Sequence, residues 1–189
     1  RVLELGGDDR RRLRGFQFLS AKPLLLVLNV DESDLAGGLD PLLDRHGLAE
    51  MATGPLTRAV ALCAKIELEI AQLEPADAAA FLADLGLTAS GLDRVIRASY
   101  ELLGYISFFT VGEDECRAWS IPRWTVAQAA AAEIYTDLSR GFIRAEVVAY
   151  DRLVARGAMA ACRDHGEVRL EGKEYLVLDG DILNVRFAT

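Results

Sequence analysis

The sequence predicts two consecutive domains: an α/β domain with parallel strands, then an α+β domain in which a helix packs on a mixed sheet. Two observations distinguish the two predicted domains. The first part holds two continuous apolar runs, and after Tyr105 aromatic and β-branched residues alternate with polar ones. A third is size, because 189 residues with 51% hydrophobic content can bury a substantial core.

Composition excludes several classes of protein. This hydrophobic content excludes a disordered chain, and the longest apolar run, Leu24–Leu28, is far below the roughly 20 residues of a membrane span. Lys and Arg number 21 against 29 Asp and Glu, a net charge of −8, so we expect no DNA partner and only local basic patches. Three cysteines are too few for a disulfide framework and indicate a reducing compartment.

The chain begins with Arg1 rather than Met, from which we expect that processing or truncation removed a segment upstream. Its first 14 residues are charged and lack the apolar core of a signal peptide. Residues 1–20 are predicted to be the end of a helix. Its arginines form either a solvated face or a basic contact surface.

Two apolar runs define the first domain. Leu24–Leu28 follows Pro23 and is predicted to be a strand buried on both faces of a parallel sheet, as is Ala59–Cys63. A helix around Leu39–Arg45, flanked by glycines, connects them. Ligands in open α/β sheets bind at the carboxyl ends of such strands.

Three helices are predicted next, over Ile66–Leu73, Ala78–Leu85 and Leu92–Leu103. Pro75 suits a first helical turn and Gly86 a stop. Ser90 is a candidate N-cap, and Gly104 ends the last helix.

The second domain is predicted to open with a hairpin, Tyr105–Val111 and Cys116–Ile121, turning at 112–114. Thr125 is expected to cap a helix over Ala127–Ile134. A strand over Phe142–Tyr150 is predicted to place Ile143, Ala145, Val147 and Ala149 on one face and Arg144 and Glu146 on the other. A helix over Tyr150–Arg163 and strands over Val168–Leu170, Tyr175–Leu178 and Ile182–Phe187 complete a β-grasp, ubiquitin-like order.

Two loops at strand ends carry candidate chemistry. Asn29-Val30-Asp31-Glu32 stands where GTP-binding proteins have Asn-Lys-x-Asp, whose Asp accepts two hydrogen bonds from guanine. Glu32 is one methylene longer, which removes the guanine preference without creating one for adenine. Cys63-Ala64-Lys65 is similar to the second base loop, where the stem of Lys65 can cover a base. The alternative is that both are ordinary strand ends.

Other reactive chemistry is not indicated. No G-x-x-x-x-G-K-[ST] phosphate loop occurs, so we expect this chain alone not to hydrolyse nucleotide. Cys162 and His165 are two possible ligands without a second pair, and Ser120 and Ser139 lack a recognisable base, so no metal site and no catalytic residue is predicted.

A basic and aromatic set in the second domain suits RNA or a protein partner. Its members are Arg117, Trp119, Arg123, Trp124, Arg140 and Arg144. The alternative is ordinary sheet surface with tryptophan in the core.

Several stretches resemble one family along nearly the whole chain. They are Phe18–Glu32, Cys63–Glu67, Leu103–Gly112, Arg117–Trp119, Thr136–Asp137, Arg140–Val147, Leu170–Tyr175 and Asp179–Asp181. Together they are similar to the YchF/Obg-like ATPases, which carry Asn-x-x-Glu in place of Asn-Lys-x-Asp and end in a TGS domain. Ile121–Trp124 and Tyr135 depart from the pattern usual for that domain.

The resemblance implies that residues 1–20 end a helical arm, 21–103 are the last part of a P-loop NTPase G domain, and 104–189 are a ubiquitin-like TGS domain. It implies a cytoplasmic ATPase that prefers ATP over GTP, uses Mg²⁺, binds the ribosome or rRNA through the TGS domain, and takes part in redox or stress responses. The base-binding residues carry over to Asn29, Val30, Glu32, Cys63, Ala64 and Lys65. The family's Walker A and Mg²⁺ ligands are expected upstream. A competing hypothesis is a non-catalytic interaction module.

Overall fold

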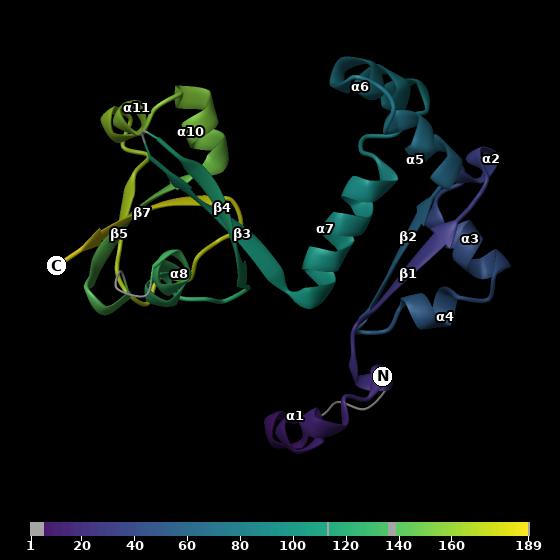
Figure 1. Cartoon of the computed structure of the whole chain (residues 1–189), viewed down its shortest axis with the longest axis horizontal. Coiled ribbons are helices and arrows are strands. Elements are labelled where there is room, and N and C mark those ends of the chain that lie inside the picture. The colour runs from purple at the N-terminus through teal and green to yellow at the C-terminus, as the bar shows by residue number, and fades with distance from the viewer. Residues whose placement is uncertain (1–5, 113, 136–138, 189) are drawn as a thin grey trace. The chain divides into compact units, whose positions relative to one another are not determined.

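The computed structural model describes residues 6–112, 114–135 and 139–188 (Figure 1). Two compact units divide the chain, Arg1–Leu103 and Gly104–Thr189. The first contains a parallel sheet and the second a mixed sheet, as the sequence predicts. No helix among the described residues is both long and apolar enough to cross a membrane.

The N-terminal unit is built on the parallel pair β1 (Leu24–Asn29) and β2 (Thr57–Leu62). The helices α2 (Glu32–Leu35), α3 (Leu39–Arg45) and α4 (Ala49–Ala52) connect the two strands. α5 (Ala64–Ile70), α6 (Pro75–Asp84) and α7 (Gly91–Leu103) follow β2. These strands, α3 and the three later helices confirm the predicted order.

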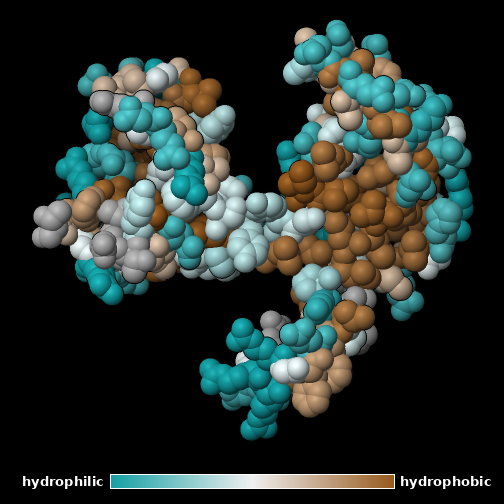
Figure 2. All heavy atoms as spheres, in the orientation of Figure 1, coloured by the Kyte–Doolittle hydropathy of each residue, from teal (hydrophilic) through white to brown (hydrophobic). Residues whose placement is uncertain are grey.

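The core of this unit is small. Leu28, Leu42, Leu43 and Ala61 are its buried members, and half-buried side chains of β1, β2, α3 and α4 surround them. The prediction that β1 is buried on both faces is wrong, because Val27 is 49% exposed and Leu28 is the strand's only buried residue. Figure 2 shows a broad apolar area over the strands and α7 of this unit.

The predicted helix over residues 1–20 is shorter than expected. Helix α1 spans Gly7–Leu13, and two 3₁₀ turns follow it, Arg14–Phe16 and Leu19–Ala21. Gln17 between them has a left-handed backbone with φ of 48°, which ends the helical geometry. Residues 1–5 lie outside the described part of the chain.

The C-terminal unit contains a five-stranded mixed sheet in the order β4-β3-β7-β5-β6. The strands are β3 (Tyr105–Val111), β4 (Cys116–Pro122), β5 (Phe142–Ala149), β6 (Arg169–Glu171) and β7 (Asp181–Phe187). β3 and β4 form the predicted antiparallel hairpin, and β3 pairs in parallel with the last strand, β7. Glu113 of the predicted turn and Thr136–Asp137 lie outside the described residues.

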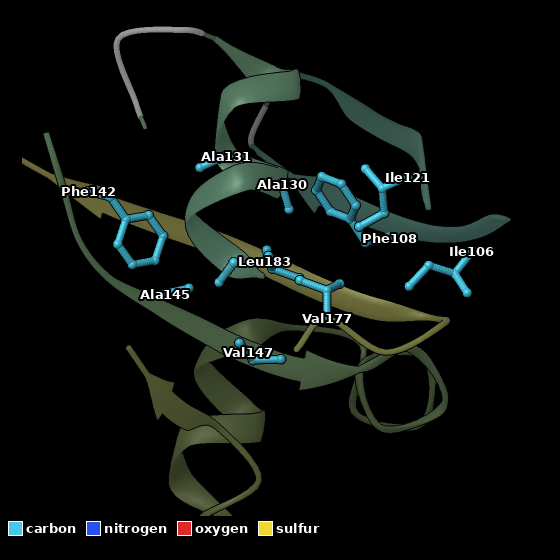
Figure 3. Close-up of a cluster of buried hydrophobic side chains, with 11 residues drawn as sticks. Ile106, Phe108, Ile121, Ala130, Ala131, Phe142, Ala145, Val147, Val177 and Leu183 are labelled. Atoms are coloured by element: carbon cyan, nitrogen blue, oxygen red, sulfur yellow. The ribbon is translucent and has the colours of Figure 1, made fainter. Parts of the chain in front are cut away.

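Helix α8 (Ala127–Ile134) covers one face of this sheet (Figure 3). Ala127, Ala130 and Ala131 are fully buried against Phe108 and Val147. Alanine suits this position because its small side chain lets the helix approach the sheet closely. The N-terminal amides of α8 donate to the carbonyls of Lys173 and Tyr175.

Three local predictions in the C-terminal unit are wrong. Thr125 does not cap α8, because its hydroxyl donates to the Pro122 carbonyl at 2.6 Å and Val126 occupies the cap position. Tyr175–Leu178 is not a strand and forms one isolated bridge, Val126 to Leu176. The predicted helix over Tyr150–Arg163 is split into α10 (Tyr150–Arg156) and α11 (Met159–Asp164), because Gly157 adopts a φ of 77° and ends the first.

The predicted alternation of β5 is also wrong at its start. A register irregularity lies between Phe142 and Arg144. The bulge turns Phe142 into the core, 3% exposed, and leaves Ile143 53% exposed. Beyond the bulge Ala145 and Val147 share the core face as expected, but Glu146 on the other face is buried too.

Candidate functional site

The two predicted base loops meet at the carboxyl ends of β1 and β2. The strands are parallel, and Asn29 at the end of β1 is in register with Leu62 at the end of β2. The Asn29 side-chain oxygen, Oδ1, accepts a hydrogen bond of 3.0 Å from the backbone N–H of Ala64. The N–H of Val30 donates to the Leu62 carbonyl at 2.9 Å. The asparagine therefore ties the first loop to the second.

The six residues of these loops divide into exposed and supporting groups. Glu32, Ala64 and Lys65 are exposed, and Asn29 is exposed beside them. Val30 is half-buried against the small core, and Cys63 is buried at the residue that precedes α5. The exposed group is available to a ligand, whereas Val30 and Cys63 hold the loops in place.

Glu67 on α5 is a positioning residue that sequence reasoning did not find. Its carboxylate oxygens accept the backbone N–H groups of Gly91 at 2.7 Å and Leu92 at 3.2 Å, at the start of α7. Acidic side chains are favourable at a helix N-terminus, where N–H groups lack helical partners. Because 24 residues separate Glu67 from Gly91, no local pattern reveals the pair.

Gly91 is required by this close approach. A Cβ atom there would lie 2.7 Å from the Glu67 carboxylate and 2.7 Å from the Leu62 Cβ. Ser90 completes the helix start as predicted, since its hydroxyl accepts the Asp93 N–H at 3.0 Å. The end of β2, α5 and the start of α7 are thus one hydrogen-bonded assembly.

The predicted basic and aromatic surface is divided between two faces of the C-terminal sheet. Arg117 lies over the Trp119 ring, 4.2 Å from its centre, and Trp119 stacks on Phe108 of the α8-covered core. Arg144 is paired across the strands with Arg186, on the same face as Glu146. Because side chains alternate across a strand, this is the face opposite α8. Arg140 is exposed just before β5.

A buried carboxylate organises that opposite face. Glu146, 4% exposed, accepts hydrogen bonds from Arg163 of α11 at 2.9 Å, from Asn184 at 3.0 Å and from Arg186. The Arg163 guanidinium is the main cause that holds the pKa of Glu146 below its usual value, against the opposing effect of burial. This cluster joins α11 to β5 and β7 and has a structural role.

A second polar cluster closes the loop before β7. The buried Asp181 accepts hydrogen bonds from the Tyr175 hydroxyl at 2.8 Å and the Leu178 N–H at 2.9 Å. Arg169 contacts both side chains, at 2.9 Å to Tyr175 and 3.3 Å to Asp181. Burial, assisted by Asp181, raises the pKa of Tyr175 to about 12.

The residues that the structure describes contain no group of three or more His, Cys, Asp or Glu placed to hold a cation. Cys162 is buried and its thiol lies 3.8 Å from the Arg152 carbonyl, while the His165 Nδ1 lies 2.8 Å from the Ala161 carbonyl. The two side chains therefore have separate backbone partners.

Comparison with known proteins finds relatives along nearly the whole chain. A family model named YchF-GTPase_C, described as a protein of unknown function (DUF933), matches residues 105–188. A protein of Bacillus subtilis named ribosome-binding ATPase YchF is 44% identical over 189 residues, 99% of this chain and 51% of its own length. The protein of that name in Pasteurella multocida is 43% identical over 187 residues, 99% of this chain and 50% of its own.

This chain belongs to the YchF family. The structure of a Schizosaccharomyces pombe YchF GTPase matches it with a TM-score of 0.80 at 27% identity, over 98% of this chain and 49% of that one. The chain spans about half the length of the curated YchF relatives it matches. The names of these relatives differ on the nucleotide: the bacterial proteins are called ATPases and the yeast protein a GTPase.

The exposed ends of the two predicted base loops carry a carboxylate, a lysine side chain and the asparagine that joins the loops. The sequence has no phosphate loop, and the described residues form no cation site, so they do not fit Mg²⁺.

Proposed function

We propose that this chain supplies the base-recognition loops and C-terminal unit of a ribosome-associated YchF-type hydrolase that prefers ATP to GTP. One observation carries the proposal: the Asn29 side chain joins the Val30–Glu32 loop to the Ala64–Lys65 loop at the ends of two parallel strands. Family membership supports the same assignment.

In this proposal Glu32 accounts for the loss of guanine recognition, and the preference for ATP is carried over from the family resemblance. An aspartate at this place accepts two hydrogen bonds from guanine, a contact worth roughly 1–3 kcal/mol. The extra methylene of Glu32 displaces the carboxylate, and adenine lacks the two donors, so guanine loses its advantage. The stem of the exposed Lys65 covers one face of the base. Phosphates and Mg²⁺ are held by the part of YchF proteins that this chain does not span.

The nucleotide proposal is tested with a chimera in which the N-terminal half of the B. subtilis relative precedes this chain. We expect the chimera to bind and hydrolyse ATP, and the 189-residue chain alone to bind it weakly or not at all. Asn29→Ala is expected to weaken ATP binding by about tenfold or more, because the two loops are no longer joined. Gln72→Ala, which removes an exposed amide elsewhere in the unit, serves as the control.

ATP affinity that is equal in the chimera and in its Asn29→Ala variant would contradict this role. Circular dichroism of both proteins separates a loss of binding from a loss of folding.

The proposed domain organisation follows the two units. Residues 1–20 are assigned to the end of a helical arm, 21–103 to the last part of a G domain, and 104–189 to a TGS domain of β-grasp type. Support comes from the strand order, in which the first and last strands of the C-terminal sheet, β3 and β7, are parallel central neighbours beneath one helix. In this proposal the protein is cytoplasmic and acts in redox or stress responses.

The ribosome is the proposed partner of residues 104–189, since the bacterial relatives are named ribosome-binding. The test is co-sedimentation of the 189-residue chain with ribosomes. Arg144→Glu and Arg117→Glu reverse a charge on opposite faces of the sheet. Loss of pelleting with only one of them identifies the contacting face, and absence of pelleting by the parent chain contradicts the proposal. Pelleting without nucleotide binding in the chimera would favour the non-catalytic interaction module.

A further inference from the structure

Three arginines surround the buried Glu146 on the sheet face opposite α8. Arg163 of α11 donates to one oxygen of the Glu146 carboxylate at 2.9 Å, and Arg186 of β7 donates to the other. Arg144 of β5 is in register with Arg186 on the neighbouring strand. Because side chains alternate across a strand, Arg144 and Glu146 project from the same face. A helix and two strands thus bring three guanidinium groups to one area.

The positive charge of this area exceeds its negative charge. Three guanidiniums share the one carboxylate of Glu146, which leaves a balance of two positive charges. Directly opposed side chains of antiparallel strands have Cβ atoms about 5 Å apart, and like charges at such positions are unfavourable. Arg144 makes no hydrogen bond or ion pair with any residue that the structure describes. An anion bound beside Arg144 and Arg186 would offset their repulsion.

Glu146 fixes two of the arginines without occupying all their donors. A guanidinium has five N–H donors, and a single nitrogen of Arg163 and of Arg186 contacts Glu146. The side chains of Arg163 and Arg186 are 46% and 60% exposed, and Arg144 is exposed as well. The remaining donors are therefore open to a ligand, and the buried carboxylate holds two of the three guanidiniums in position. This preorganisation reduces the entropy lost when an anion binds.

We propose that Arg144, Arg163 and Arg186 together bind backbone phosphates of RNA. Arginine presents pairs of N–H groups that match the oxygens of a phosphate. Because these guanidiniums are about half exposed, solvent screens each contact, and a polymer with many phosphates suits the area better than one phosphate ion. RNA is the polyanion of the proposed partner, the ribosome, so this assignment rests on the proposed function.

The test is fluorescence anisotropy of the 189-residue chain with a short labelled single-stranded RNA over a series of NaCl concentrations. We expect Arg144→Gln combined with Arg186→Gln to lower the affinity by about tenfold, and to reduce the slope of log affinity against log salt by about 1.4, or about 0.7 for each lost phosphate contact. Arg11→Gln combined with Arg97→Gln removes the same charge from exposed sites in the N-terminal unit and should change the affinity less than about twofold.

Arg144→Gln alone separates binding from folding. The Arg144 side chain has no partner among the described residues, and its replacement relieves the repulsion by Arg186. The free energy of unfolding, followed by tryptophan fluorescence in urea, should therefore stay equal or rise while RNA affinity falls by about threefold to fivefold. A residue with a merely structural role would instead lower the stability and leave RNA affinity unchanged.

Three outcomes would overturn the proposal. The first is no RNA binding by the parent chain, and the second is an equal loss of affinity in the double variant and its control. The third is displacement of the RNA by the peptide acetyl-Ala-phosphoserine-Ala-amide at a lower concentration than by unlabelled RNA nucleotides, which would identify a phosphorylated protein as the partner.

Ribosome co-sedimentation distinguishes this site from the proposed function. Equal pelleting of the parent chain and of the Arg144→Gln, Arg186→Gln variant would overturn the phosphate site and leave the ribosome as the partner. RNA binding that depends on the two arginines, without pelleting of the parent chain, would support the site and contradict the ribosome as the partner.

Discussion

The two units differ in how much of their stability comes from a buried core. Among the described residues, the C-terminal core has eleven buried members, which α8 and a five-stranded sheet contribute or enclose. The N-terminal core has four, beside a two-stranded sheet in which Val27 is half exposed. The N-terminal unit also has a set of specific polar contacts that position its loops, Asn29 with Ala64 and Glu67 with Gly91 and Leu92. Packing fixes the C-terminal unit, and hydrogen bonds position the N-terminal loops.

The largest expected effect is on the C-terminal core. Phe108 is fully buried, so Phe108→Ala should lower the free energy of unfolding of that unit by about 3–5 kcal/mol. Both tryptophans, Trp119 and Trp124, lie in this unit, so fluorescence during urea unfolding reports it selectively. A fluorescence midpoint that does not fall would contradict the importance given to this core.

Leu28→Ala is the matched change in the N-terminal unit. Leu28→Ala removes a buried leucine from the four-residue core and should cost about 2 kcal/mol, near the low end for this substitution, because the site is open enough to relax. The loss is expected in the urea transition followed by circular dichroism. The tryptophan transition should stay at its parental midpoint, and a shift in it would show that the two units do not unfold independently.

Gly91→Ala tests the polar assembly of the N-terminal unit. The new Cβ would lie 2.7 Å from both the Glu67 carboxylate and the Leu62 Cβ, so we expect a loss of about 1–3 kcal/mol. Gly7→Ala, where a Cβ meets no atom within 4 Å, is the control. An equal effect of the two substitutions would refute the close approach of α7 to β2.

Acid should weaken the C-terminal unit through Glu146. Its pKa is lower in the folded state, mainly because Arg163 donates a hydrogen bond to it. The contribution is therefore fully present above the unfolded pKa of about 4.5 and is lost as the pH falls through the lower folded value. Fluorescence-detected urea midpoints between pH 7 and pH 3 measure this loss, and Glu146→Gln should flatten the dependence of the midpoint on pH.

Glu146→Gln should also lower the free energy of unfolding at pH 7 by about 1–2 kcal/mol, since Arg163 and Arg186 both reach solvent. A profile unchanged by Glu146→Gln would exclude this carboxylate as the cause.

The smallest expected effect concerns Arg117. Its guanidinium covers the half-buried Trp119 ring, an interaction worth about 0.5–1 kcal/mol at an exposed site. Arg117→Gln should lower the free energy of unfolding, measured by fluorescence in urea, by that amount, and Arg123→Gln should not. A larger loss would place Arg117 in the core packing rather than on its surface.

Patterns that depend on neighbouring residues could be predicted from the sequence. The apolar runs of β1 and β2, the glycine-flanked α3, the Pro75 start of α6 and the β3–β4 hairpin all carry local signals, and the structure confirms them. The position of Asn29 beside the second loop also followed, because parallel strands end at the same edge of a sheet.

Features that depend on distant contacts could not be predicted. The bulge that turns Phe142 inward is set by pairing with β7, 40 residues or more along the chain. Glu146 looks like a solvent-facing residue of an alternating strand until α11 brings Arg163 over it. Threonine is a common N-cap residue, but at the start of α8 the backbone N–H groups donate instead to the carbonyls of Lys173 and Tyr175. Tertiary hydrogen bonds override local preference in each case.

In the proposed function, Glu32 at the joined loops reduces recognition of guanine. The most direct test is the ratio of ATP to GTP dissociation constants for the chimera with the B. subtilis N-terminal half. We expect tighter binding of ATP, and we expect Glu32→Asp to move the ratio toward GTP by about tenfold or more while Glu69→Asp, on exposed α5 surface, leaves it unchanged. A chimera that prefers GTP, with a ratio that Glu32→Asp does not alter, would contradict the claim.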